Sequence, residues 1–181
     1  MEAFGDLIFA MAHWLRTTTL SEFSLWLSNQ PVSQVIDRNF WAIPTIQTIH
    51  ILAIATMFGS VGMITLRIFQ LAGRGRTVVQ TVERYLPWMW RALLTLLVTG
   101  LLMVIGEPVR ELINPVFWMK MILVVAAALV GLWFQSSVRR DPARWELTPE
   151  RQVSVRAGAV GVIVLLCVIM FAGRWIAYAP V

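Results

Sequence analysis

The chain of 181 residues is 58% hydrophobic and 14% charged, with a mean hydropathy of +0.71 and a formal net charge of +5. Soluble domains contain about 45–50% apolar and about 25% charged residues, so the composition excludes a soluble domain and indicates an integral membrane protein. The arginines stand beside long apolar runs and form no separate basic domain, which argues against nucleic acid as a partner.

The N-terminal segment, residues 1–39, is predicted to be amphipathic and to lie on the outer face of the membrane. Two stretches, about 4–16 and 20–29, carry apolar residues at helical spacing but are too short to span a bilayer. Thr19 followed by Glu22 suggests a capping box at the start of the second stretch. We expect both stretches to form helices in the membrane interface.

Residues 40–181 are predicted to form a bundle of four transmembrane helices. The apolar runs lie at about 40–71, 87–106, 115–135 and 155–178, and a helix needs about 20 such residues to cross a bilayer. The pairs Asn114–Pro115 and Thr148–Pro149 are typical of helix starts, so they mark the third and fourth helices. The expected fold is an all-α integral membrane protein with four transmembrane helices and N-terminal amphipathic interfacial helices.

Arginine placement predicts the orientation of this bundle. The connections after the first and third spans are rich in arginine, and the positive-inside rule puts them in the cytoplasm. The predicted location is the bacterial inner (plasma) membrane, multi-pass, with both termini periplasmic. Small residues four apart, such as Ala55 and Gly59, favour a homo-oligomer or a larger membrane complex as well as contact with the lipid bilayer.

The central polar residue of the first predicted span is His50, about 15 Å along the helix and so near mid-bilayer. Gln47 lies one turn earlier on the same face. The imidazole could bind a haem iron, although the other histidine, His13, falls in the N-terminal segment and leaves a bis-histidine haem hard to build. It could instead bind copper together with methionines such as Met57.

Further alternatives for His50 stay open. It could handle a proton or a substrate, or it could hydrogen-bond Gln47 or a threonine of another helix and serve packing alone. A second candidate site is an outer polar cluster of Glu107, Lys120 and Arg174, for which snorkelling to the head groups is the plainer explanation. The sequence has no phosphate-binding loop and no His/Cys cluster, which argues against an enzyme that acts alone.

Two segments carry a resemblance: IPTIQTIHILAIATMFGSVGMITLRIF and LLTLLVTGLLMVIGEPVRELINPVFWMKMILVVAA. They resemble an uncharacterised family of small bacterial inner-membrane proteins with the patterns P-x-x-Q-T-x-H-x-L and N-P-x-F-x-x-K. The matching residues are Pro44, Gln47, Thr48, His50, Thr99, Gly100, Asn114, Pro115, Phe117 and Lys120.

The chain is more remotely similar to CopD, the copper-resistance membrane proteins, which also have a histidine early in a long span. In the family that the chain resembles, a histidine often ends the third span, where this chain has Gln135. The resemblance implies a role for His50, Gln47 and Lys120 beyond packing, and it implies copper as the metal.

The sequence therefore predicts an inner-membrane protein that handles a metal ion, with copper favoured, or a redox cofactor such as haem b. His50 is the expected ligand or proton carrier, Gln47 orients it, and Met57 is a candidate metal ligand. The alternatives are a membrane anchor or electron-passing subunit of a periplasmic oxidoreductase, and a purely structural subunit of a larger complex.

Overall fold

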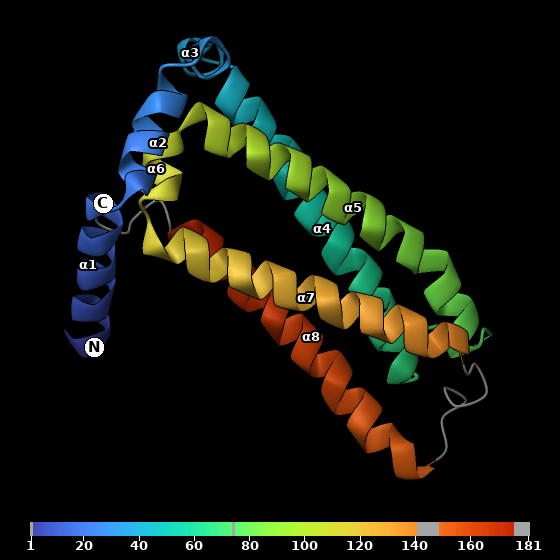
Figure 1. Ribbon diagram of the computed structural model, residues 1–181. Coiled ribbons are helices and arrows are strands. Elements are labelled where there is room, and N and C mark those ends of the chain that lie inside the picture. The colour runs from blue at the N-terminus through green and yellow to red at the C-terminus, as the bar shows by residue number, and fades with distance from the viewer. Residues whose placement is uncertain (1, 74, 141–148, 176–181) are drawn as a thin grey trace. The chain divides into compact units, whose positions relative to one another are not determined.

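The computed structural model describes residues 2–73, 75–140 and 149–175, and its described elements are all helices (Figure 1). In chain order they are α1 (Glu2–Thr17), α2 (Thr19–Ser28), α3 (Pro31–Arg38), α4 (Ala42–Ile68), α5 (Val78–Gly106), α6 (Pro108–Leu112), α7 (Pro115–Arg140) and α8 (Pro149–Trp175).

Four of these helices are long and apolar enough to cross a membrane: α4, α5, α7 and the part of α8 from Val155 to Trp175. Large apolar side chains on them stay exposed, including Ile122 at 69%, Trp133 at 65% and Phe171 at 64%. A soluble monomer rarely exposes so much apolar surface, whereas lipid chains cover it at no cost. The chain is a multi-pass membrane protein with an all-α fold, and the predicted fold class is confirmed.

The helix ends differ from the predicted ones mainly in α5, which begins at Val78 although the apolar run begins at Pro87. A capping box explains the early start, because the Gln80 N–H donates to Thr77 Oγ1 at 3.2 Å and the Thr77 N–H donates to Gln80 Oε1 at 3.1 Å. Pro87 lies inside the helix instead of opening it.

The ends of the other spanning helices lie closer to their predicted positions. The helix α4 stops short of the predicted ends at 40 and 71, and α7 runs past Gln135 to Arg140. The predicted N-cap Thr148 and the last residues of the predicted fourth span, 176–178, lie outside the described residues.

Two short helices, α3 and α6, were not predicted, and each has proline at its start. The predicted capping box of Thr19 and Glu22 is wrong. Thr18 is the N-cap residue of α2, and its hydroxyl donates to the Leu15 carbonyl at 2.6 Å instead of capping the helix.

The chain divides into two compact units. Unit 1 comprises Met1–Ile51, Leu97–Leu123 and Ile169–Val181, and unit 2 comprises Leu52–Leu96 and Val124–Val168. Each of the four spanning helices therefore contributes one stretch to each unit. The N-terminal segment groups with unit 1, and its position on the outer face of the membrane stays a prediction.

In unit 1 the core forms around α6 and the start of α7, where Leu112, Val116 and Phe117 are buried. Partly buried apolar residues from other helices pack on these three: Leu20, Val104, Met121 and Ala172. The helix α2 lies against α6 and also contacts α1 (Figure 1). The fully buried Asn114 accepts a hydrogen bond from the Val116 N–H at 3.0 Å, which confirms the predicted N-cap.

Gly106, the last residue of α5, allows a close approach within unit 1. A Cβ at this position would lie 2.7 Å from Ile43 Cδ1 and 2.8 Å from Ile36 Cγ2. Glycine is therefore the residue that lets α3 and the first turn of α4 pack against the end of α5.

In unit 2 most buried residues are apolar, with Val61, Ile64, Ile68, Val82, Leu86, Met89, Val138 and Leu166 among them. Ser60, Thr65 and Thr81 are buried there as well, and they are polar but uncharged. The indole N–H of Trp90 donates to Gln135 Oε1 at 2.7 Å, so α5 and α7 also share a polar contact there. Arg91 lies over the Trp88 ring at 5.3 Å from its centroid.

Candidate functional site

The half-buried imidazole of His50 lies in unit 1 and is anchored by a neighbouring helix. Its Nδ1 is 2.7 Å from Thr99 Oγ1 of α5, and Thr99 is only 4% exposed. Gly100 follows, and a Cβ there would be 4.0 Å from His50 Cε1, an ordinary contact distance, so this edge of the ring lies beside the α5 backbone. One alternative for His50 combined a hydrogen bond to a threonine of another helix with a role in packing alone; the bond is observed, and the role stays a prediction.

The structure separates His50 from two of its predicted partners. Gln47 is exposed, and the orienting bond predicted for it is made by Thr99 instead. Met57 belongs to unit 2 and lies seven residues further along α4, about 10 Å of helix rise. His13 is exposed on α1.

Lys120, near the start of α7, is the charged group associated with His50. Its ammonium group lies close enough to His50 and to Glu111 for its charge to act on both. Gly173 of α8 lies beside it, since a Cβ there would be 3.3 Å from Lys120 Nζ. Residues of α4, α5, α7 and α8 thus form one polar cluster in unit 1, which we call the histidine cluster: His50, Thr99, Gly100, Lys120 and Gly173.

Two acidic residues of unit 1, Glu107 and Glu111, lie at the N-cap of α6 and within it. Glu107 forms an ion pair with Arg110 in which Nη1 and Oε2 are 2.6 Å apart. Burial raises the pKa of Glu111 above its ordinary value near 4.5, although the charges of Lys120 and Arg110 act in the opposite direction. Of the predicted outer cluster, Lys120 therefore belongs beside Glu111, Glu107 pairs with Arg110, and Arg174 is exposed near the end of α8.

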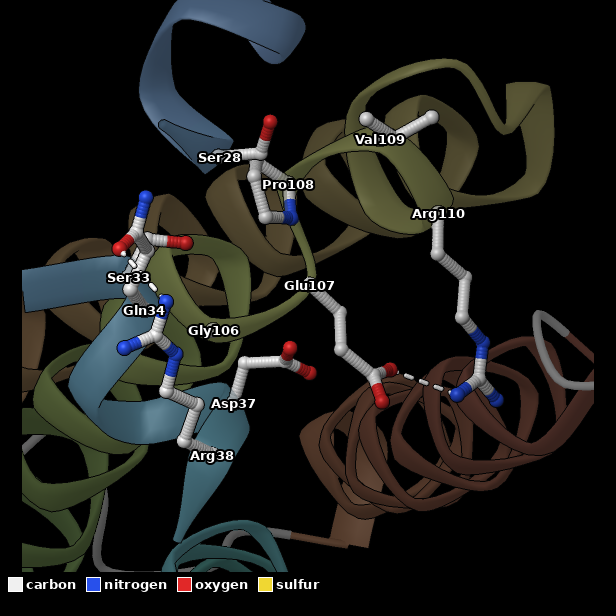
Figure 2. Close-up of a pocket in the computed structure, with 10 residues that line it drawn as sticks. All are labelled: Ser28, Ser33, Gln34, Asp37, Arg38, Gly106, Glu107, Pro108, Val109 and Arg110. Atoms are coloured by element: carbon white, nitrogen blue, oxygen red, sulfur yellow. Dashed lines mark hydrogen bonds and ion pairs between the residues drawn. The ribbon is translucent and has the colours of Figure 1, made fainter. Parts of the chain in front are cut away.

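A polar pocket of about 410 Å³ opens in unit 1 between α3 and the junction of α5 with α6. Its charged lining residues are Asp37, Arg38, Glu107 and Arg110, with Ser33 and Gln34 beside them (Figure 2). Figure 2 shows the Asp37 carboxylate directed toward the Glu107 side chain, whose own carboxylate turns to the Arg110 guanidinium. The guanidinium of Arg38 is turned the other way and donates to Gln34 Oε1 at 3.3 Å.

A second pocket of about 410 Å³ lies in unit 2 and is of the opposite character. Thr56, Gly59, Ser60, Met63, Tyr85 and Trp88 line it, and none of these carries a charge at neutral pH. The two pockets have the same size but differ in the ligand chemistry that they could accept.

Sequence reasoning missed this charged pocket and did not identify Thr99 as the partner of His50. Thr99 stands in the TG pair of the resemblance, which was a usable signal. No sequence pattern indicated the pocket, because its lining residues lie on α3 and at the junction of α5 with α6, and neither short helix was predicted. Within the described residues no group of three or more His, Cys, Asp or Glu side chains is arranged to hold a metal ion.

Residues 36–179 match the model of a family of unknown function, DUF6644. The match covers all four spans and begins within α3, so α1 and α2 lie before it. No curated protein and no solved structure matches the chain.

Proposed function

The chain belongs to this DUF6644 family, and from the histidine cluster we propose that it is a membrane protein that holds a redox cofactor at His50, with haem b the best-suited group. The observation that carries the proposal is the contact between His50 Nδ1 and Thr99 Oγ1 at 2.7 Å. When Nδ1–H donates to the hydroxyl, the lone pair of Nε2 is free to ligate. Ligating histidines are commonly held by such a bond from the other ring nitrogen.

The charge of Lys120 selects among the possible ligands of this histidine. A cation close to His50 opposes the binding of a bare metal ion and favours a cofactor that carries negative groups. Haem combines an iron that imidazole binds with propionate groups that an ammonium can pair with.

Copper, the other cofactor that the sequence suggests, has less support. Its candidate ligand Met57 lies seven residues beyond His50 on α4, about 10 Å of helix rise, and the charge of Lys120 opposes a cation near His50. The broader alternatives, an anchor or electron-passing subunit of a periplasmic oxidoreductase, agree with a haem at this site. A purely structural subunit would need no ligand at Nε2.

The bacterial inner membrane as location and the periplasmic termini are part of the same proposal. Arginines support the orientation, since Arg67, Arg76 and Arg84 fall around the α4–α5 connection and Arg139 and Arg140 at the end of α7. With that orientation the ends of α5 and α8 in unit 1, and the charged pocket, face the periplasm. A reporter enzyme that functions only in the periplasm should be active when fused to the C-terminus, and one that functions only in the cytoplasm should be inactive there.

The experiment that tests the cofactor is optical and elemental analysis of the full chain purified from untreated membranes. We expect a Soret band that is absent in His50→Ala and kept in Met57→Leu. Thermal unfolding of both variants in the same detergent controls for loss of fold. A colourless protein without bound metal overturns the proposal, and copper that depends on both His50 and Met57 would replace haem with the copper site.

A further inference from the structure

The charged pocket of unit 1 carries a separate inference, independent of any cofactor at His50. Its charged residues, Asp37, Arg38, Glu107 and Arg110, comprise two acids and two bases, so their formal charges cancel. Because burial of net charge is costly, a pocket with cancelling charges suits a ligand whose own charges cancel.

The ion pairing within the pocket leaves one group of each sign available. Glu107 and Arg110 neutralise each other at 2.6 Å. Within the described part of the chain, Asp37 has no ion-pair partner, and Arg38 bonds only the uncharged amide of Gln34. Figure 2 shows the Asp37 carboxylate directed into the pocket, with the Arg38 guanidinium on the α3 side of it.

Each available group has a matching ligand group. The Asp37 carboxylate accepts hydrogen bonds from a primary ammonium group, which a quaternary ammonium cannot donate. The Arg38 guanidinium binds a phosphate or a carboxylate through its paired N–H groups. A ligand that carries a primary amine and a phosphate a few atoms apart meets both requirements.

The position of the pocket suits a membrane source for that ligand. Gly106, which ends the spanning helix α5, is part of its lining, so the pocket lies where hydrocarbon gives way to head groups. Directly after α3, Phe40 and Trp41 are 78% and 71% exposed and pack edge to face at 5.4 Å between ring centroids. Exposed aromatic rings at this depth are typical of contact with the lipid interface.

We propose that the charged pocket binds the head group of an amine-bearing zwitterionic phospholipid, with the ammonium at Asp37 and the phosphate at Arg38. The pocket volume of about 410 Å³ holds a head group of this kind and leaves the acyl chains outside, against apolar surface.

The test is lipid retention by the full chain in detergent, measured by native mass spectrometry. The probes are phosphatidylethanolamine, phosphatidylcholine and phosphatidylglycerol with identical acyl chains. We expect retention in the order ethanolamine, then choline, then glycerol. Equal or stronger retention of phosphatidylglycerol overturns the proposal. That lipid has no amine, so the result would mean that the pocket recognises the phosphate alone.

Variants test whether the lipid binds in this pocket. Asp37→Asn should weaken retention of phosphatidylethanolamine about tenfold, because the ammonium group loses one charge-assisted hydrogen bond. Arg38→Gln should weaken it similarly. Asp6→Asn removes an exposed acid of α1 outside the pocket and is the matched control. If Asp37→Asn, with an unchanged unfolding temperature, retains as much lipid as Asp6→Asn, the proposal is wrong.

Free phosphoethanolamine distinguishes the source of the head group. Its addition without lipid should raise the unfolding temperature of the wild type but not of Asp37→Asn if the pocket also takes the soluble group. Retention of the lipid with no response to phosphoethanolamine supports the same pocket with the lipid as its source. Failure of both probes to bind overturns the inference.

Discussion

Unit 1 and unit 2 share the four spanning helices, yet charged residues line the pocket of unit 1 and uncharged residues line the pocket of unit 2. Unit 1 holds the histidine cluster, the fully buried Asn114 and the charged pocket. Unit 2 holds mostly aliphatic residues and an uncharged pocket of the same size. The contrast teaches that overall hydropathy locates a span, whereas titratable and charged groups within it indicate where to look for a functional site.

The largest expected difference between the units concerns glycine. Gly106→Ala places a Cβ within 2.7 Å of Ile43 Cδ1, so it should lower the free energy of unfolding by about 1–3 kcal/mol. Gly59→Ala in unit 2 meets nothing within 4 Å and should stabilise α4 by up to about 1 kcal/mol. Thermal unfolding of both variants in detergent measures the difference. Equal effects would mean that unit 1 is no more tightly packed at this point.

A second comparison uses threonine. Thr99→Val removes the hydroxyl that contacts His50 Nδ1 and should cost about 1–2 kcal/mol, because a half-buried ring nitrogen loses its partner. Thr56→Val in unit 2 removes only a bond to the Leu52 carbonyl of its own helix and should cost less than about 0.5 kcal/mol.

The same variant separates a positioning role from a purely structural one. If a haem is ligated by His50, Thr99→Val should weaken its retention about 10–100-fold and shift its absorption bands. Thr56→Val should change neither. An unaltered spectrum in Thr99→Val would show that the threonine serves packing alone.

Helix caps provide a third comparison. Asn114→Ala removes the buried cap of α7 and should destabilise by about 1–2 kcal/mol. Thr77→Ala removes the exposed capping box of α5 in unit 2 and should cost about 0.5–1 kcal/mol. Unfolding measurements that rank these variants in the opposite order would contradict the difference in burial.

The smallest expected effect concerns pH. Burial raises the pKa of Glu111 in the folded state above its ordinary value near 4.5. Between the ordinary and the raised pKa the folded chain binds more protons than the unfolded chain. The free energy of unfolding should therefore fall as pH rises through this range. Glu111→Gln should remove this part of the slope. Glu83→Gln, at an exposed acid of unit 2, is the matched control and should keep it. Unfolding temperatures measured at several pH values decide between these outcomes.

The fold class could be predicted because lipid imposes a simple rule: long apolar runs must be helical. The cap at Asn114 could be predicted because Asn–Pro is a local signal. The short helices α3 and α6 could not, since five to eight residues carry too little periodicity and depend on tertiary contacts.

The site was predicted only in part, for a related reason. His50 was found because a titratable group in an apolar run is conspicuous in one sequence. Its partner Thr99 lies 49 residues away, and the TG pair singles out this threonine without indicating a contact with His50. Gln47 was preferred for its spacing of one turn, but it is exposed.

Pro87 inside α5 has a consequence for how this span deforms. Proline has no N–H, so the carbonyl of Glu83, four residues earlier, receives no backbone hydrogen bond from position 87. The helix therefore has one hydrogen bond fewer at this turn. Amide hydrogen exchange should therefore be fastest around this turn of the span. Bending at Pro87 takes place in unit 2 and can leave the bond between His50 and Thr99 intact.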